Sequence, residues 1–260
     1  MALYLRPMSR NQLRGLDVEA AENLSLPTSL LMENAGRGAA AWFAELVGAI
    51  SPDKGGRPFL SLETSQPYIV DQKPTLPTVL IVCGSGNNGG DGAVMARHLN
   101  AWGFSVRVIW FSQKSQLRDD PALQWTILEN SKIYQLTWWD NYPSDIMANF
   151  SLLRTQLNGS EWLVDALLGT GLSRPLDAPL RFVIELMNNS GKPIFALDLP
   201  SGLDCDTGKP LDLAIRATAT ATFVAPKLGF SKPGAFDYTG KVAVIDIGLP
   251  ACLLAPYYER

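Results

Sequence analysis

Residues 78–99 read TVLIVCGSGNNGGDGAVMARHL. The first six, 78–83, form a continuous apolar run, which is typical of a strand buried on both faces of a parallel sheet. A polar, glycine-rich loop follows at 84–92, and a helical pattern runs over 92–102. In open parallel sheets, ligands bind outside the carboxyl ends of the strands. We therefore expect this loop to form part of a binding site.

The loop formally fits a dinucleotide-binding fingerprint, with Gly84, Gly86 and Gly89 at the GxGxxG spacing. That fingerprint also requires an acidic residue about 20 residues later, which binds the ribose hydroxyl group. Here the second predicted strand, 105–111, ends without one, and no acid occurs before Asp119. The loop therefore favours a polar or phosphate-bearing ligand, bound differently from NAD in an ordinary dehydrogenase.

The same loop carries more polar side chains than the fingerprint needs. Asn87 and Asn88 supply amide donors and acceptors, and the glycines let a ligand approach the backbone closely. Asp91 has two interpretations, a ligand-binding carboxylate or the N-cap of the following helix. The sequence GNNGGDG is thus much more specific than GxGxxG alone.

Strands and helices alternate along the rest of the chain. The hydrophobic patterns predict helices at 9–23, 28–47, 92–102, 119–129, 145–157 and 179–188. They predict strands at 78–83, 105–111, 132–136, 162–166, 193–197, 218–224 and 242–247. This alternation indicates an α/β fold with a mostly parallel sheet covered on both faces. We expect one domain, 1–260, in which the proline-rich residues 51–77 form a mobile loop insertion.

A second strand ends in candidate site residues. Asp165 lies in the apolar run WLVDALLG, where a buried carboxylate needs a hydrogen-bond partner or a cation. No His or Cys lies nearby, so the metal expected is a hard ion with oxygen ligands; capping of a turn is the alternative. The GTG sequence at 169–171 suits phosphate binding through backbone N–H groups. Arg174 either adds charge to that phosphate or pairs with Asp177.

Asp198 directly follows the predicted strand 193–197, in the sequence DLPSGLD. A carboxylate at the carboxyl end of a strand, beside a ligand loop, is the best general acid/base candidate. Ser201 is a weak nucleophile candidate, because its surroundings are not GxSxG and the one histidine, His98, lies on a predicted helix. Lys227 is a candidate for a phosphate contact, with a solvated lysine as the alternative.

Composition argues against several classes of protein. With a net charge of −3, the 260 residues offer no broad basic surface for nucleic acid. Three scattered cysteines and one histidine fit neither a disulfide framework nor a zinc site. No apolar stretch approaches about 18 residues, so no membrane span is expected. The first residues lack a signal peptide, which makes the cytoplasm the expected location.

Six sequences occur in the order typical of a known family: LMENAG at 31–36, GSGNNGGDG at 84–92, DALLGTGLSRPL at 165–176, DLPSGLDCDTG at 198–208, TATFVAPKLGF at 220–230 and VIDIGLP at 244–250. Together they resemble the N-terminal domain of the YjeF family, the NAD(P)H-hydrate epimerases. The resemblance implies a Rossmann-like three-layer α/β/α sandwich, commonly a homodimer. It also implies interconversion of the R and S forms of hydrated NADH and NADPH (NADHX and NADPHX), which carry water at C6 of the nicotinamide ring.

The resemblance assigns site residues by motif. It implies substrate contacts at Asn87, Asn88, Gly89, Gly90, Asp91, Gly169, Thr170, Gly171, Leu172, Ser173, Arg174, Pro175 and Asp198. It implies one potassium ion per subunit, held by Asn88, Asp165 and Ser201. Many relatives continue into an ADP- or ATP-dependent dehydratase domain, which we expect to be absent here and to act as a functional partner.

A mechanism follows for such a substrate. Loss of the C6 hydroxyl gives a conjugated cation stabilised by the ring nitrogen, and water returning to the other face gives the epimer. Asp198 can act as the acid, the base and the negative charge beside the ring. Two alternatives stay open, an NADP-dependent reductase and a non-catalytic dimeric scaffold or binding module. The missing acid after the second strand weakens the NAD form of the reductase, and no second substrate domain is evident; the intact site residues weaken the scaffold.

Overall fold

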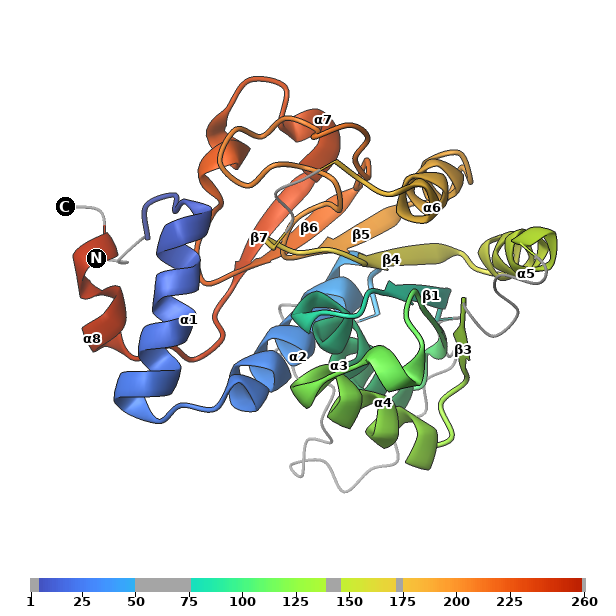
Figure 1. Cartoon of the computed structure of the whole chain (residues 1–260), viewed down its shortest axis with the longest axis horizontal. Helices are drawn as coiled ribbons and strands as arrows, with labels where there is room; N and C mark the ends of the chain where they lie inside the picture. Colours follow the sequence, from blue (N-terminus) through green and yellow to red (C-terminus); the bar gives the residue numbers. More distant parts are fainter. Residues whose placement is uncertain (1–4, 50–75, 139–145, 172–174, 259–260) are drawn as a thin grey trace.

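The computed structural model describes residues 5–49, 76–138, 146–171 and 175–258. Its centre is a seven-stranded sheet with the order β3-β2-β1-β4-β5-β6-β7, and all neighbouring strands are parallel (Figure 1). The strands are β1 (Thr78–Cys83), β2 (Ser105–Trp110), β3 (Gln135–Thr137), β4 (Trp162–Ala166), β5 (Ile194–Leu197), β6 (Ala219–Phe223) and β7 (Lys241–Ile245). The predicted parallel α/β sheet is thus confirmed.

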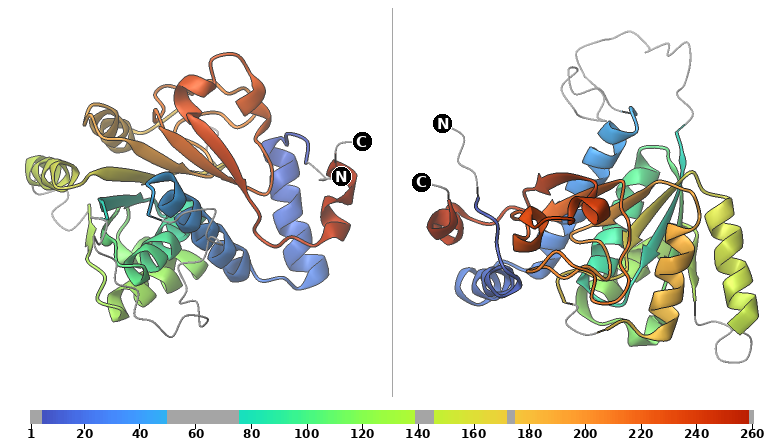
Figure 2. Two further views of the ribbon diagram at one scale, coloured as in Figure 1. Left: turned by 180° about the vertical axis from the view of Figure 1, so that it is seen from behind. Right: turned by 90° about the horizontal axis from the view of Figure 1, so that it is seen from above.

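Helices cover both faces of this sheet, which gives three layers (Figure 2). One face carries α1 (Arg10–Leu24), α2 (Thr28–Leu46), α3 (Asn87–Ala101) and α4 (Asp119–Asn130). The other carries α5 (Ile146–Asn158) and α6 (Ala178–Asn188). The shorter described helices are η2 (Lys114–Gln116), η3 (Leu228–Ser231), α7 (Phe236–Thr239), α8 (Ala251–Leu254) and η4 (Ala255–Tyr257). Successive β1 side chains enter opposite cores, with Ile81 in the first and Leu80 in the second, which explains the continuous apolar run.

The order of the strands reverses between β1 and β4, which lie side by side at the centre of the sheet. From β1 the chain builds outward through β2 and β3, and from β4 it builds outward in the other direction. Such a reversal opens a crevice at the carboxyl ends of the two central strands, where doubly wound folds bind their ligands. The loops that follow β1 and β4 are the glycine-rich segments singled out from the sequence.

Two element boundaries differ from the prediction by more than two residues. α3 begins at Asn87 rather than at residue 92, with Gly86 as its N-cap, so the interpretation of Asp91 as an N-cap is wrong. The glycines that argue against a helix here instead let its first turn pack tightly against the loop after β1. β3 begins at Gln135 rather than at residue 132, because Lys132 adopts a left-handed turn with a φ of 57°.

Two other expectations concern the remaining chain. Residues 51–75 of the predicted loop insertion lie outside the described residues. No helix in the described part of the chain is long and apolar enough to cross a membrane.

The tight start of α3 gives a prediction for Gly89. An added Cβ atom there would lie 2.0 Å from the carbonyl oxygen of Gly84. Because that oxygen belongs to the backbone, it cannot move aside as a flexible side chain could. We expect Gly89→Ala to lower the free energy of unfolding by about 3 kcal/mol, measured by urea denaturation. The control is Gly15→Ala in α1, where nothing lies within 4 Å. The free energy of unfolding of Gly15→Ala should rise by up to about 1 kcal/mol. An unchanged denaturation midpoint for Gly89→Ala would contradict the packing described.

Candidate active site

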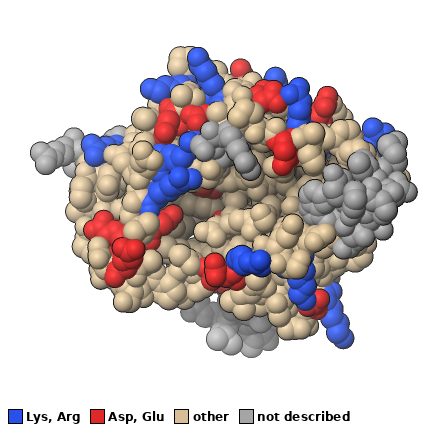
Figure 3. Space-filling view, viewed as in Figure 1, with Lys and Arg blue, Asp and Glu red and all other residues tan. Residues whose placement is uncertain are grey.

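A cavity of about 590 Å³ opens at the carboxyl ends of the central strands. Its walls come from α1, α2, the start of α3 and the loops after β4, β5 and β6. The polar and charged residues that line it are Arg14, Asp17, Thr28, Ser85, Asn87, Asn88, Asp91, Thr170, Asp198 and Lys227. Figure 3 shows a hollow in this face of the molecule, with basic and acidic side chains on its rim. Residues from all three predicted post-strand loops therefore meet in one cavity.

Asp198 enters the cavity directly from the end of β5. Its backbone is left-handed, with a φ of 63°, and its N–H donates to the carbonyl oxygen of Ala221 at 2.7 Å. The Nζ atom of Lys227 lies 2.5 Å from Oδ1 of Asp198 and donates to the carbonyl oxygen of Phe223 at 3.0 Å. The side chain of Lys227 is 2% exposed, so the interpretation as a solvated lysine is wrong. This buried ion pair fixes the position of the Asp198 carboxylate.

Two further carboxylates line the cavity near this pair. Burial raises the pKa of Asp91 well above its usual range, and the charges of Asp198 and Asp17 raise it further. Asp17, on α1, keeps contact with solvent, yet partial desolvation and then the charge of Asp198 raise its pKa to about 6. Lys227 opposes both shifts. The raised pKa favours the protonated, neutral form of Asp91, so the negative charge in the cavity comes from Asp198 and, above pH 6, from Asp17; these charges stabilise a cation developing on a bound ligand.

Asp165 and Ser201 form a hydrogen-bonded unit that is buried rather than lining the cavity. The hydroxyl group of Ser201 donates to Oδ1 of Asp165 at 2.6 Å, and its backbone N–H donates to Oδ2 at 2.7 Å. The N–H of Leu167 donates to Oδ1 at 3.2 Å, and that of Leu168 donates to the Ser201 oxygen at 2.9 Å. Burial raises the pKa of Asp165 to about 6, although these hydrogen bonds act against the shift. The unit links the loop after β4 to the loop after β5.

Asn88 is the one polar side chain lining the described cavity whose buried amide nitrogen and oxygen both lack a hydrogen-bond partner. A buried amide without partners is costly and indicates an interaction with a group that is not part of the chain. The side chain is 7% exposed and lies beside Gly169, where an added Cβ would sit 3.5 Å from Cβ of Asn88. Amide, carbonyl and carboxylate oxygens are ligands for hard cations. Asn88 therefore fits the ion implied by the sequence.

The structure places the remaining predicted site residues as follows. Asn87, Gly169, Thr170 and Gly171 line the cavity. Gly89 and Gly90 do not; they pack against Gly84 and Met32. Pro175 is exposed and away from the lining, while Leu172, Ser173 and Arg174 lie outside the described residues. His98, which the sequence places on a predicted helix rather than in a site loop, contacts Glu33 on α2 through Nε2 at 2.8 Å.

Sequence reasoning missed the contribution of α1 to the cavity. Leu13, Arg14 and Asp17 all line it, although α1 follows no strand and lies far from the glycine-rich loops in the sequence. The apolar spacing of Leu13 and Leu16 predicts the helix, but it does not show where the helix packs. The polar residues beside that apolar stripe, Arg14 and Asp17, were the available signal that this helix contributes to a site.

Burial of Asp165 predicts a dependence of stability on pH. Its pKa in the folded chain, about 6, exceeds the ordinary value of 3.8, so between these values the folded state binds more protons than the unfolded state. Stability contributed by this group is therefore complete below pH 4 and is lost as the pH rises through 6, by about 3 kcal/mol. In potassium-free buffer, Asp165→Asn should remove this part of the loss, measured by urea denaturation at pH 4.5 and 7.5. Equal pH dependence in both proteins would contradict the assignment.

Comparison with known proteins agrees with this geometry. The family model described as YjeF-related protein N-terminus matches residues 28–229, more than half of the chain. The chain belongs to the YjeF-related protein N-terminus family. The matched range includes every predicted site residue, from Asn87 to Ser201, as well as Lys227.

Curated relatives of this YjeF-type chain cover most of its length. A Rhodopirellula baltica protein named NAD(P)H-hydrate epimerase is 36% identical over 255 residues, which is 98% of this chain and 89% of that protein. A Pirellula staleyi protein of the same name is 40% identical over 68% of this chain and 75% of its own. The Salinibacter ruber bifunctional NAD(P)H-hydrate repair enzyme Nnr is 34% identical, and the match covers 97% of this chain but 42% of that enzyme.

A solved structure shares the YjeF-type fold. The crystal structure of yeast ynu0, YNL200c, superposes with a TM-score of 0.68 over 87% of this chain and 84% of the yeast chain, at 22% identity. This likeness supports the three-layer architecture.

Proposed function

We propose that this chain is an NAD(P)H-hydrate epimerase, an isomerase that interconverts the R and S forms of NADHX and NADPHX at C6 of the nicotinamide ring. Two observations carry the proposal. Relatives named NAD(P)H-hydrate epimerase match the chain at 36–40% identity. The carboxylate of Asp198 lies in the central cavity and forms an ion pair with the buried Lys227.

The substrate chemistry calls for a carboxylate at this place. C6 bears a hydroxyl group next to the ring nitrogen, so departure of that hydroxyl leaves a cation delocalised over the ring. A group that protonates the leaving hydroxyl and accepts a proton from the incoming water typically contributes about 100- to 10,000-fold to the rate. Asp198 is assigned this role. Asp17 adds negative charge at the same cavity above pH 6 and favours the cation electrostatically, whereas burial favours the neutral form of Asp91.

Asn88, Asp165 and Ser201 are assigned to a potassium ion. Two observations support the fit: the partnerless amide of Asn88, and the fully buried Asp165, which forms no ion pair with a cationic side chain of the described residues. Within the described residues, no group of three or more His, Cys, Asp or Glu side chains could hold a metal ion. Bound potassium would supply positive charge that compensates Asp165 and holds the loops after β1, β4 and β5 together.

A coupled assay tests the function. A mixture of R and S NADHX is incubated with an S-specific, ATP- or ADP-dependent dehydratase, and NADH is followed by absorbance. The dehydratase repairs the S form quickly, and the R form only as fast as it epimerises. Adding this protein should abolish the slow phase in potassium buffer. A slow phase at the spontaneous rate, with or without potassium, would overturn the epimerase and favour the non-catalytic binding module.

Three broader assignments accompany the epimerase. The dehydratase is the functional partner, which agrees with the bifunctional relatives in which both activities share one name. A homodimer and a cytoplasmic location complete the proposal. Size-exclusion chromatography with light scattering tests the dimer, and fractionation of the source cells tests the location.

A further inference from the structure

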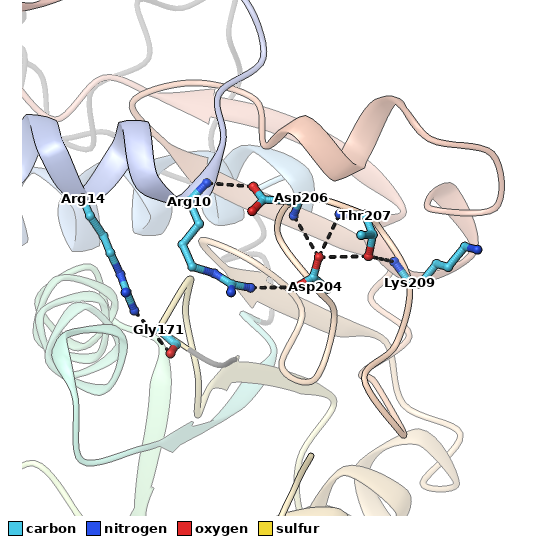
Figure 4. Close-up of polar contacts among 7 residues, drawn as sticks. All are labelled: Arg10, Arg14, Gly171, Asp204, Asp206, Thr207 and Lys209. Carbon is cyan, nitrogen blue, oxygen red and sulfur yellow. Dashed lines mark hydrogen bonds and ion pairs between the residues drawn. The ribbon is translucent and has the colours of Figure 1, made fainter. Parts of the chain in front are cut away.

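The position of α1 over the cavity is fixed at its first turn. Ser9 caps the helix: its hydroxyl accepts from the N–H of Gln12 at 3.3 Å, and its own N–H donates to Oε1 of Gln12 at 2.9 Å. The guanidinium of Arg10 donates to Oδ2 of Asp204 at 2.7 Å, and the Arg10 N–H donates to Oδ1 of Asp206 at 2.8 Å (Figure 4). Asp204 and Asp206 belong to the segment that begins with Asp198. The helix is therefore attached to the same loop that supplies the catalytic carboxylate.

Arg14 lies one turn beyond Arg10, on the same side of α1, and its side chain extends toward the glycine-rich loop after β4 (Figure 4). Its Nη2 atom is 3.4 Å from the carbonyl oxygen of Gly171, a long hydrogen bond that leaves most of the guanidinium donors unused. Arg14 is exposed and lines the cavity. The planar guanidinium of Arg14 is therefore available to bind a ligand at the entrance of the cavity.

The charges around the cavity single out Arg14. Of the described lining residues, only Arg14 and Lys227 are cationic, and Lys227 is already paired with Asp198. Asp17, Asp91 and Asp198 are acidic. A dinucleotide carries two negative charges on its pyrophosphate, which the carboxylates of Asp17 and Asp198 repel. Binding such a ligand here requires a compensating cation, and Arg14 is the one on the described lining that forms no ion pair.

We propose that Arg14 binds the pyrophosphate group of the dinucleotide substrate, next to the loop at 169–171. The inference rests on the proposed function for the identity of the substrate. An arginine fork matches phosphate oxygens in a bidentate manner, whereas a lysine supplies charge without that geometry. Arg14 thus acts in binding and leaves the chemical step at C6 to other residues.

The test compares Arg14→Ala and Arg14→Lys with the wild-type chain. Removing a charge-assisted contact should raise KM for both NADHX and NADPHX by about 10- to 100-fold and change kcat by less than about twofold. The KM of Arg14→Lys should lie between the KM of the wild-type chain and that of Arg14→Ala. The matched control is Arg181→Ala, which removes an exposed arginine that pairs with Asp212 outside the cavity. KM should stay unchanged in that control.

Calorimetric titration with ADP-ribose and with nicotinamide mononucleotide separates the inference from the proposed function. ADP-ribose carries the pyrophosphate, and its affinity should fall by about 10- to 100-fold in Arg14→Ala. Nicotinamide mononucleotide carries a single phosphate in place of the pyrophosphate, so it should lose less affinity than ADP-ribose does. A loss confined to NADPHX would instead place Arg14 on the 2′-phosphate and overturn the inference, as would unchanged KM and affinity. If wild type fails to epimerise but ADP-ribose binding still depends on Arg14, the proposed function fails and the inference stands.

Discussion

Replacing Asp198 by Asn is expected to lower kcat for NADHX epimerisation by about 100- to 10,000-fold and to change KM by less than about threefold. Asn keeps the size of the side chain but cannot accept a proton or carry negative charge beside the ring. The effect falls on the chemical step, because the contacts made by α1, α3 and the loop after β4 are untouched. The measurement is the coupled assay in potassium buffer, with Asp237→Asn on the exposed surface of α7 as the control.

Full activity of Asp198→Asn would remove Asp198 from the mechanism. The carboxylates of Asp91 and Asp17 would then be the remaining candidates on the described lining. A raised KM with unchanged kcat would show that Asp198 orients the substrate and transfers no proton.

The second large effect concerns Lys227 and the stability of the fold. Asp198→Asn leaves the buried ammonium group of Lys227 without its carboxylate, which should lower the free energy of unfolding by about 3 kcal/mol. Adding Lys227→Met removes the uncompensated charge, so the double variant should be more stable than Asp198→Asn alone. Activity should remain low in the double variant. Urea denaturation of both single variants and the double variant measures the coupling.

Two results would contradict this description of the ion pair. Additive free energies in the cycle would show that Lys227 and Asp198 do not interact strongly. Recovery of activity in the double variant would show that Asp198→Asn acts only through folding. The cycle therefore separates the catalytic and structural roles of Asp198.

The sequence predicts those parts of the site that depend on local order along the chain. An apolar strand followed by glycines and polar residues places Asn87, Gly169 and Asp198 at one edge of a parallel sheet, and the structure confirms that they share a cavity. The positions of the central strands β1, β4 and β5 follow equally well, since burial on both faces gives apolar runs. These features depend on neighbours in sequence and on general rules for parallel sheets.

The partners of the buried charges could not be predicted in the same way. Lys227 sits 29 residues after Asp198 in the sequence, and nothing in VAPKLGF distinguishes a paired lysine from a solvated one. Arg14 and Asp17 reach the cavity because α1 packs on the core through Leu13 and Leu16 and because Arg10 attaches it to Asp204. The start of α3 was misplaced because helix propensity penalises glycine, whereas close packing on the β1 loop requires it. Tertiary contacts decide each of these cases.

The left-handed backbone at Asp198 restricts what can replace it during evolution. Apart from glycine, Asn and Asp are the residues that adopt this conformation most readily. An Asp codon becomes an Asn codon through a single base change, and a Lys codon, AAG, becomes the Met codon through another. A change at Asp198 would remove the catalytic carboxylate, and a second change at Lys227 would remove the ammonium group left unpaired. The cavity and its phosphate-binding Arg14 would persist. Where Lys227 is encoded by AAG, a lineage of this protein therefore lies two point mutations from a stable receptor for the same dinucleotide.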